Sequence, residues 1–598
     1  MANGFGSLFI GASGLRNAQT ALNTTANNMS NVDTAGYVRQ QVRFADMDYN
    51  RLKVSCANVN LQQAGLGVSI GDVVHARDIF LDKVYRQENG RREFYSVRYE
   101  TADYVEDLLQ ELDGEEFKES VKDLWSAYQM LATNPSDSVT QNLVLQKAEL
   151  LVKRSQDLYN NLQSYQSNIN EQIQDDVDAV NKMGERIYEL NLEIQKVEAG
   201  GVETAMTLRD ERDYILDKLS AYANIDVTED AYGFVFVDLE GVRFIDEHRC
   251  YTMETLKDDG TGFVTPYWPQ LSNLTDPKNP IYVDVFRMTG GFDAETSSDI
   301  GGIKSKMMVR GDDYGRAEDL ATEEAYDKIE FCTLMKVEAQ IDMLFSSIVK
   351  EMNDLFCPNI TLDFELTLQS DTVLTADVTL ADGTVVPAGE TIQAGSTIQA
   401  GSLRILDEEN SPVGVDGELP PRELFVRSDC ERYTEVTGAD GKTYYIYNEE
   451  DASKAGICYS IGNVHINEEL EKQITLMPAY KNDGVFETVD HDLGNKISAA
   501  WENQGMHLNP YDKKPCNFEN FYDRVLSELG VEGNTYKSVM ETMEASTASY
   551  DNKRQMVTGV SSDEELTQMI KYQSAYNAAS RFMTVISEMT ELIVTGLI

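Results

Sequence analysis

The chain has little proline, few cysteines for its length and no long hydrophobic run. Its 598 residues include only 13 prolines, and 42% are hydrophobic and 25% charged, so disorder along the whole length is not expected. No stretch of about 18 consecutive apolar residues occurs, and we therefore expect no membrane-spanning helix. A chain of this length is too long to fold around a single hydrophobic core, and we therefore predict several domains.

Positive charge is scarce. The sequence has 51 lysines and arginines against 101 aspartates and glutamates, a formal net charge of −50. Such a chain repels phosphate backbones and anionic lipid headgroups. We therefore expect a solvated acidic surface, no nucleic-acid partner and no membrane insertion.

The cysteines and histidines are too scattered to form a metal site. No CxxC pair and no HExxH occurs, which argues against a zinc ribbon, a thioredoxin-type motif and a zincin. An odd number of widely spaced cysteines in so large a chain also disfavours a disulfide framework. We expect isolated, mostly buried thiols and no cofactor. The cysteines are Cys56, Cys250, Cys332, Cys357, Cys430, Cys458 and Cys516.

Catalytic motifs are missing as well. Adjacent acids such as Asp312-Asp313 and Glu323-Glu324 are expected by chance among 101 acidic residues. No P-loop, nucleophile elbow or EF-hand pattern accompanies them, so we predict that the protein is not an enzyme. Phe5 to Leu15 is short and apolar enough for a signal peptide, but no basic residue precedes it, and we expect no cleaved signal.

The N-terminal segment carries a seven-residue apolar repeat, which predicts an amphipathic helix. The larger members of the repeat are Leu8, Leu15, Leu22 and Met29, and the second seam position holds Gly11, Ala18, Thr25 and Val32. Glycines at 4, 6, 11 and 14 each cost about 1 kcal/mol relative to alanine. We therefore expect a helix that forms only against a partner.

The C-terminus has a matching repeat. One series is Tyr572, Ala579, Ile586 and Ile593, and the other is Ala575, Phe582 and Met589, flanked by Met569, Tyr576 and Met583. Ser561 followed by Glu564 fits a capping box before this run. The two ends thus predict amphipathic helices of roughly 30 residues each, and packing them together is the simplest way to bury both stripes.

Between the ends the sequence predicts long helices and then β structure. Apolar residues from Leu158 to Val197 recur with a mean step near 3.5, a coiled-coil period, over a rod of about 60 Å. Further helices are expected over about 96–131, 203–222, 321–356 and 534–557. A hairpin is expected at 234–239 and 242–245, and short strands over 360–480. That last region holds a tandem TIQAGS at 391–396 and 397–402, and two copies are too few for a solenoid.

These patterns predict a multidomain α+β protein, whose paired terminal helices form a coiled-coil or helical-bundle core with mainly β domains inserted in the middle. We expect four parts. They are a terminal helical domain (1–34 with 560–598), a long-helix rod domain (35–222, 302–356 and 485–559), a β insert (223–301) and a variable, β-rich outer domain (357–484).

A polar run from Asn27 to Tyr37 ends the first helix, and taken alone it is a helix stop. The whole stretch 7–41, however, resembles the N-terminal signature of flagellar rod, hook and hook-associated proteins. In that family a hydrophobic helix runs into N-N-x-[SA]-N-x-x-T-x-G-[YF]. The positions that match are Asn28, Ser30, Asn31, Thr34, Gly36 and Tyr37, and Arg39-Gln40 is similar to the hook-associated subset.

Three further segments resemble the same subset. They are Leu208 to Asp213 (LRDERD), Gly301-Gly302 leading to Arg310-Gly311-Asp312, and 559–566 with 572–579. The second match is looser because Gly311 is inserted, and Thr558, Ser561 and Ser562 depart from the third. The middle β region resembles nothing we can name.

The resemblance implies that the terminal helices form the inner core of a helical tube. The implied assembly interface comprises Leu8, Leu15, Leu22, Asn28, Met29, Asn31, Gly36, Tyr37, Leu566, Tyr572, Ala575, Tyr576, Ala579, Phe582, Met583, Ile586, Met589 and Ile593. The implied partners are further copies in a ring, the hook protein, the third hook-associated protein and a cytoplasmic export chaperone on the C-terminal helices.

The implied role is a secreted, extracellular ring at the junction of hook and filament, needed for filament attachment and exported by the flagellar type III channel. Another axial protein (hook, distal rod or third hook-associated protein) is the first alternative, and a secreted adhesin the second.

Overall fold

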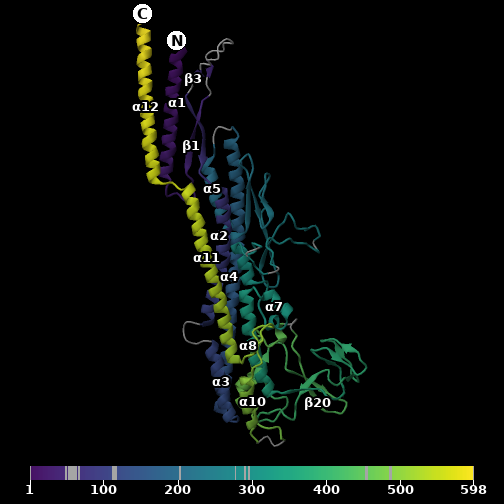
Figure 1. Ribbon diagram of the computed structural model, residues 1–598. Helices are drawn as coiled ribbons and strands as arrows, with labels where there is room; N and C mark the ends of the chain where they lie inside the picture. Colours follow the sequence, from purple (N-terminus) through teal and green to yellow (C-terminus); the bar gives the residue numbers. More distant parts are fainter. Residues whose placement is uncertain are drawn as a thin grey trace.

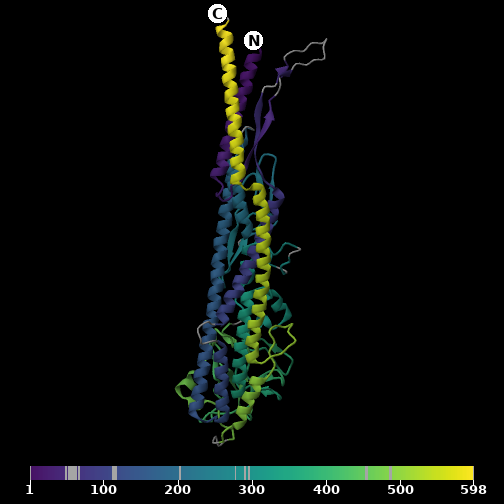
Figure 2. The same ribbon diagram turned by 60° about the vertical axis from the view of Figure 1, so that its left-hand side comes forward.

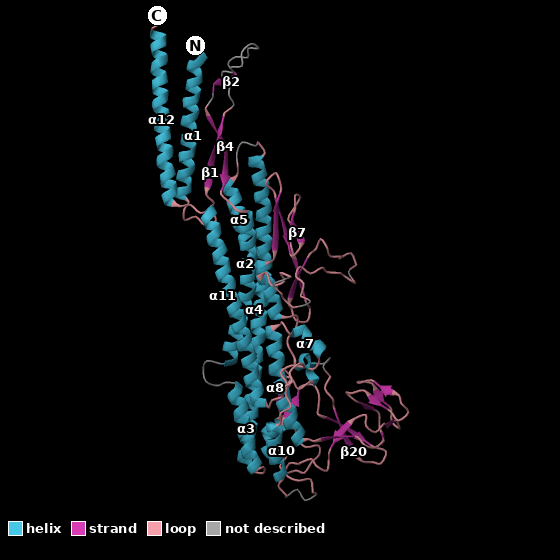
Figure 3. Cartoon of the chain, viewed as in Figure 1, coloured by secondary structure: helices cyan, strands magenta, loops and turns pink. Residues whose placement is uncertain are grey.

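The protein is an elongated stack of long helices, with both chain ends at one extremity and the β structure along one side (Figures 1 and 3). The computed structural model describes residues 2–47, 50–51, 63–64, 67–110, 117–200, 204–276, 278–288, 291–293, 296–451, 455–483 and 488–596. The predicted α+β class, with paired terminal helices and inserted β regions, is confirmed. The four domain boundaries remain a prediction.

The two ends of the chain pair as predicted. Helix α1 (Ala2–Ser30) lies antiparallel beside α12 (Ser562–Thr595), and both views show them side by side (Figures 1 and 2). Ser561 caps α12 by accepting the Glu564 N–H. Against α1 lies a hairpin of β1 (Gln40–Asp46) and β4 (Val68–His75), which continues into β2 (Asn50–Arg51) and β3 (Gln63–Ala64).

A bundle of long helices forms the rod. Its members are α2 (Ile79–Gln110), α3 (Phe117–Thr133), α4 (Ser138–Glu198), α5 (Met206–Tyr222), α6 (Gly302–Arg310), α8 (Thr333–Phe356) and α11 (Phe518–Thr558). The coiled-coil pattern over 158–197 is confirmed as helix, but α4 begins earlier, at Ser138, where Asp137 accepts the Val139 N–H. Its 61 residues span about 90 Å. Likewise α11 begins at Phe518 rather than near 534, with Asn517 as its cap.

Two predicted helices are each divided. The helix expected over 96–131 is α2 and α3, with 111–116 outside the described residues. The helix expected over 321–356 is α7 (Glu323–Ile329) and α8, and the 3-10 turn Ala317–Leu320 precedes them. The break follows Ile329 because the Phe331 carbonyl turns to accept the buried Arg98 guanidinium (3.3 Å), while the Phe331 ring packs on Phe292.

The β insert flanks α4. Strands β5 (Ile225–Glu229), β6 (Val235–Leu239) and β7 (Val242–Ile245) form an antiparallel sheet, which confirms the predicted hairpin. Val235, Val237 and Leu239 alternate inward along β6 and belong to the main core. A second pair, β8 (Glu254–Lys257) and β9 (Val264–Tyr267), follows along the rod.

The outer domain consists of short strands, as predicted. They are β10 (Asn359–Thr361), β11 (Leu366–Thr367), β12 (Thr372–Val373), β13 (Val378–Thr379), β14 (Val385–Val386), β15 (Thr391–Ile392), β16 (Thr397–Ile398), β17 (Arg404–Leu406), β18 (Phe425–Arg427), β19 (Tyr433–Thr437), β20 (Thr443–Tyr447) and β21 (Val464–Ile466). Short helices α9 (Glu468–Lys472) and α10 (His491–Glu502) and the 3-10 turns Ala455–Ile457 and Ile474–Leu476 lead the chain back to the rod.

A six-residue repeat underlies this domain, and it is longer than the TIQAGS tandem. One aliphatic residue recurs at every sixth position, and all seven belong to one core cluster: Leu362, Leu368, Leu374, Leu380, Val386, Ile392 and Ile398. The strands nest as antiparallel pairs, β10 with β17, β11 with β16, β12 with β15 and β13 with β14. Counting only two copies was therefore wrong; the tandem is the best-preserved part of a longer array.

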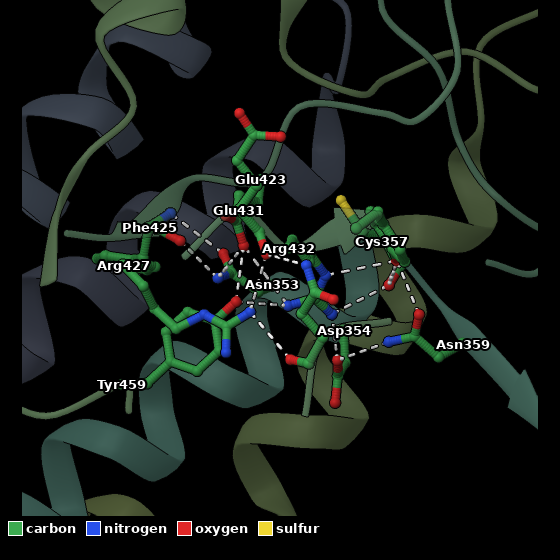
Figure 4. A network of polar contacts seen from close by, with 12 residues as sticks. Asn353, Asp354, Cys357, Asn359, Glu423, Phe425, Arg427, Glu431, Arg432 and Tyr459 are labelled. Atoms are coloured by element: carbon green, nitrogen blue, oxygen red, sulfur yellow. Dashed lines mark hydrogen bonds and ion pairs between the residues drawn. The ribbon is translucent and has the colours of Figure 1, made fainter. Parts of the chain in front are cut away.

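A buried polar network fixes the outer domain to the end of α8 (Figure 4). Asn353 on α8 donates to Glu423 (3.0 Å) and to the Phe425 carbonyl (2.7 Å). Arg432, 4% exposed, donates to the Cys357 carbonyl (3.1 Å), pairs with Asp354, and lies 3.5 Å from Glu423. Buried hydrogen bonds and ion pairs thus hold the outer domain against the end of α8.

This network predicts a selective loss of stability. Arg432→Met leaves Glu423 buried without its cation, which typically costs about 3–5 kcal/mol. We expect faster amide hydrogen exchange in β17, β19 and β20 but unchanged exchange in α4. Arg404→Met, which removes a partly exposed pair with Glu449, should cost at most about 1 kcal/mol. Equal effects of the two substitutions would contradict the assignment.

Candidate assembly interface

The face of α1 that meets α12 consists of small residues. Gly11, Ala18, Ala21 and Thr25 are buried there. A Cβ added at Gly14 would lie 3.6 Å from the Cβ of Ala579, and one added at Gly11 would lie 2.5 Å from the Sδ of Met583. The two backbones therefore approach closely, and Met583 fills the space that Gly11 leaves.

The larger apolar residues of α1 flank this contact. Leu8, Leu15, Leu22 and Met29 are each only half-buried, and Val32, beyond the helix, is 41% exposed. The heptad stripe thus has two parts in the single chain. Its small seam is used inside the subunit, and its leucine seam keeps exposed apolar surface.

Helix α12 is open to solvent along its length. Of its residues 562–595, only Glu565 is buried. The predicted site residues Tyr572, Tyr576, Ala579, Met583 and Ile586 are half-buried and share the face turned to α1. The remaining predicted residues Leu566, Ala575, Phe582, Met589 and Ile593 are exposed, the large ones by 42% to 56%.

A buried polar cluster closes the lower end of the helix pair. Asn28 donates to Glu565 (3.1 Å) and to the Gln40 carbonyl (3.0 Å), and accepts from Tyr37 (2.8 Å) and from the Gln40 N–H (3.1 Å). Arg39 pairs with Glu565 at 2.7 Å and Glu564 at 2.9 Å. Every hydrogen-bonding position of the Asn28 amide is used, so this residue fixes where α1 ends against α12.

The tyrosine of this cluster stays protonated at neutral pH. Burial, followed by the charges of Asp210 and Glu565, raises the pKa of Tyr37 to about 12. Its hydroxyl therefore remains the donor in the bond to Asn28.

Asn31 and Gly36 shape the turn itself. Asn31 donates to the Asn27 carbonyl (3.0 Å) and accepts from the Thr34 hydroxyl (3.1 Å). Gly36 has φ +80°, and a Cβ there would lie 3.0 Å from the Cβ of Tyr214. The predicted residues Asn28, Asn31, Gly36 and Tyr37 are therefore gathered at one turn, where each has a partner inside the same chain.

The LRDERD segment of α5 forms the joint between the terminal pair and the rod. Asp210 accepts the Val38 N–H (3.2 Å) and lies 3.3 Å from His75. Asp213 pairs with Arg77, while Arg212 is buried and donates to Asn191 (3.0 Å). One turn further along, Asp217 pairs with Arg86 (2.7 Å) and Arg554 (2.8 Å). The prediction of site residues missed this joint, although the alternating charges of the motif signal it.

Burial controls the charges at the joint. It raises the pKa of Asp210 to about 7, against the lowering effects of the Val38 N–H and Arg77. It lowers the pKa of His75 to about 4, with Arg77 and Arg209 adding to the effect. His75 is therefore neutral at physiological pH, and the joint carries less charge than its sequence indicates.

Two hollows border the terminal pair. A cavity of about 350 Å³ lies between α1, β1 and α12, and Thr25, Arg39, Val42, Gln568 and Tyr572 are among its lining residues. A larger groove of about 1040 Å³ lies between α1, β4 and the start of α5. Phe44 of β1 packs edge-on against Tyr572 with ring centroids 6.1 Å apart.

Neither a metal centre nor a membrane segment is found in the part of the chain that the structure describes. No group of three His, Cys, Asp or Glu side chains there could hold a metal ion, and no helix is both long and apolar enough to cross a bilayer. Cys357, Cys458 and Cys516 are buried, whereas Cys250, Cys332 and Cys430 are partly exposed. Cys56 lies outside the described residues.

Three family models match this chain, one over part of the long helices and the β insert and two at the chain ends. The helical domain of the flagellar hook-associated protein FlgK matches residues 102–283. The flagella basal body rod protein matches 8–37, and the C-terminal region of the flagellar basal body rod FlgEFG proteins matches 557–595. The terminal matches coincide with the paired helices α1 and α12.

Known relatives agree with these models. Flagellar hook-associated protein 1 of Bacillus subtilis is 24% identical over 596 residues, covering 99% of each chain. The protein of the same name from Salmonella typhimurium is 27% identical over 220 residues, covering 36% of this chain and 38% of that one. A solved structure of the flagellar hook junction protein FlgK from Burkholderia pseudomallei aligns with 80% of this chain and 100% of that chain, at 15% identity and a TM-score of 0.44.

The close approach of α1 and α12 predicts different effects of substitutions at two glycines. Gly11→Ile should push α1 from α12, because even its Cβ would lie 2.5 Å from the Sδ of Met583 and its branched side chain extends further. We expect faster hydrogen exchange of α1 amides and unchanged exchange in α4. Gly14→Ala, with 3.6 Å of space, should be neutral or stabilise α1 by about 1 kcal/mol. Slow exchange in Gly11→Ile would show that the pair does not depend on this approach.

Proposed function

Because the chain is a hook-associated member of the flagellar rod and hook proteins, and so a structural protein rather than an enzyme, we propose that it forms the ring joining hook to filament. In this role it assembles through α1 and α12, attaches the growing filament, and lies outside the cell. Its neighbours along the axis are the hook protein and the third hook-associated protein.

One observation carries the self-assembly part of this proposal. Helix α12 has an apolar heptad pattern along its 34 residues, yet only Glu565 is buried in the single chain. Large exposed apolar surfaces of monomeric proteins mark interaction sites. The apolar residues of this helix are exposed or half-buried in the single subunit, and packing between copies of the protein would bury them.

The place at the junction is supported by the extent of the similarity. Rod and hook proteins share the two terminal helices, since the rod models match only 8–37 and 557–595. The match over 102–283 is to a hook-associated protein, and the similarity to the Bacillus subtilis protein covers 99% of both chains. These observations favour the junction protein over the hook and distal rod alternatives.

We further propose export by the flagellar type III channel and a chaperone for the C-terminal helix. Gly6, Gly11 and Gly14 weaken α1, which favours a chain that remains unfolded during export. The exposed Phe582 (42%) and Met589 (56%) make α12 prone to aggregate before assembly. A cytoplasmic chaperone that covers this helix removes that hazard.

A deletion strain tests the function. We expect cells that lack this protein to carry hooks without filaments, to release flagellin into the medium and to be non-motile, because the filament has no ring to which it can attach. Electron microscopy of the cells and immunogold labelling of wild-type flagella are the measurements. Attached filaments on the deletion strain would overturn the proposal.

Complementation of that strain tests the interface. Leu15→Asp or Phe582→Asp places a charge in the apolar stripes, which costs several kcal/mol if the stripes are buried between copies. Both variants should fail to restore filaments while hydrogen exchange in α4 stays unchanged. Asn577→Asp, at an exposed position of the same helix, is the matched control and should restore them. Normal junctions with Leu15→Asp or Phe582→Asp would contradict the assignment.

Removal of residues 560–598 tests the chaperone proposal. The truncated protein should no longer retain the export chaperone in a pull-down from cytoplasm, because the exposed apolar face of α12 is gone. A variant that lacks the outer domain, 357–484, serves as the control and should still bind. Retention by the truncated protein would refute this part of the proposal.

A further inference from the structure

We propose that a proton on Glu338 holds one segment of the subunit against α8, and that this segment opens when the proton is lost. The segment, hereafter the strap, is defined as residues 311–329, which comprise the loop after α6, the 3-10 turn Ala317–Leu320 and α7. The inference concerns the folded subunit and holds whether or not the protein forms the junction ring.

Glu338 lies directly beneath the strap. This α8 residue is completely buried, and its Oε2 accepts the Gly315 N–H at 2.7 Å. Gly315 has no room for a side chain, because a Cβ there would collide with the Met335 carbonyl. The Oε1 of Glu338 is buried without a hydrogen-bond partner among the described residues, and none of their ion pairs includes it. A carboxylate that leaves water for such a site loses several kcal/mol of hydration, so the neutral acid is the favoured form.

Asp342, one turn further along α8, holds the same strap. It is 3% exposed, its Oδ2 accepts the Ala317 N–H at 3.0 Å, and its Oδ1 accepts the Ile461 N–H at 2.8 Å. Two backbone donors favour the charged form of this side chain, whereas Glu338 has only one. Because two negative charges one helical turn apart repel each other, ionisation of Asp342 further favours a proton on Glu338.

The groups around this pair of acids are mostly acidic themselves. The strap contributes three carboxylates and one cation, α4 a tyrosine, α8 a lysine, and the segment that returns from the outer domain a cysteine: Asp313, Glu318, Asp319, Arg316, Tyr159, Lys350 and Cys458. Lys350 is already paired with Glu450 at 2.8 Å. Burial raises the pKa of both Tyr159 and Cys458, so these two groups stay neutral. Little positive charge is therefore available to stabilise an ionised Glu338.

These surroundings shift both buried acids in the same direction. Burial raises the pKa of Glu338 to about 8, against the lowering effect of the Gly315 N–H. The charges of Asp313, Asp319 and Asp342 add to the rise. Burial also raises the pKa of Asp342 to about 6. Near neutral pH the aspartate is therefore charged and the glutamate is protonated.

The direction of the pH effect follows from this shift. In the open strap Glu338 meets water, and its pKa returns to the ordinary value of 4.5. A proton is therefore released on opening. The stabilisation of the closed strap is fully present below about pH 4.5, declines above it, and is lost as the pH rises through about 8. Acidic and neutral media thus hold the strap closed, and alkaline media release it.

The strap, rather than α8, is the part that moves. Its apolar contacts with α8 form a small cluster apart from the main core, made of Leu320, Tyr326, Ile329, Met335 and Ala339. Helix α8 itself contributes Val337 and Ile341 to the main core, and elements with few buried contacts open first. Because Asp342 also holds Ile461, opening loosens the segment that returns from the outer domain, while the buried network at Arg432 stays closed.

Hydrogen exchange of the purified full-length subunit at about pH 6.5 and about pH 7.5 tests the inference. Protection factors, corrected for the intrinsic effect of pH on exchange, are compared for peptides of the strap and of α4. In the wild type we expect strap protection to fall roughly five- to tenfold between these two values, because opening releases about one proton, and α4 protection to stay constant. Glu338→Gln cannot ionise, and its strap protection should change less than about twofold.

Glu324→Gln is the matched control, because Glu324 is an exposed acid of the same strap, and it should retain the full pH dependence. Equal strap protection at the two pH values in the wild type would overturn the inference. So would a Glu338→Gln variant that keeps the pH dependence of the wild type. If Glu338→Gln also loses protection in α4, Glu338→Met takes its place, since apolar side chains of similar volume are often tolerated at buried charged sites, and the same two outcomes decide.

Discussion

The contact between Asn28 and Glu565 constrains the whole architecture. It joins residues 537 positions apart at 3.1 Å, and both side chains are almost completely buried. Loss of either partner leaves an unsatisfied buried group, so the two ends of the chain are held together in the folded subunit. Every insertion must then leave from and return to this point, which is why α11 runs back along α2 and both termini lie at one extremity.

The joint built on α5 extends this constraint into the rod. Asp210 holds the backbone of Val38 directly after the Asn28 turn, and Arg554 near the end of α11 reaches Asp217. The two segments that connect the terminal helix pair to the rod are therefore both bound to α5. Since burial keeps His75 neutral and raises the pKa of Asp210, the joint depends on hydrogen-bond geometry as much as on net charge.

Sequence patterns predicted the elements better than the partners of each face. The heptads identified both terminal helices because period alone tells which residues share a face. They could not show that Gly11 faces α12 while Leu15 remains half-exposed, since that depends on what packs on each side. For the same reason the break at Phe331 was not predicted, because apolar spacing continues through it and only the contact with Arg98 explains it.

The six-residue repeat of the outer domain could have been predicted from the sequence, and there is a physical reason why it was missed. Neighbouring units are identical throughout only in TIQAGS, whereas the earlier units share single positions, such as the aliphatic residue that recurs from Leu362 to Ile398. Packing requires no more than that, because each unit must place one apolar side chain in a shared core. Glycines with φ between +82° and +88° close the turns at 383, 389, 395 and 401, and this second period of six was equally visible.

The distribution of charge permits the contacts between copies that we propose. The net charge of −50 makes subunits repel one another at a distance, but ions at physiological strength screen this repulsion beyond about 8 Å. Within that distance the charges on the contacting surfaces determine whether two copies attract or repel each other. Helix α1 has a single charged residue. Helix α12 has three acidic residues in its first turn, where the helix dipole favours negative charge. Repulsion along the rods therefore limits unspecific association, and the neutral terminal seams remain the surfaces where close approach costs least.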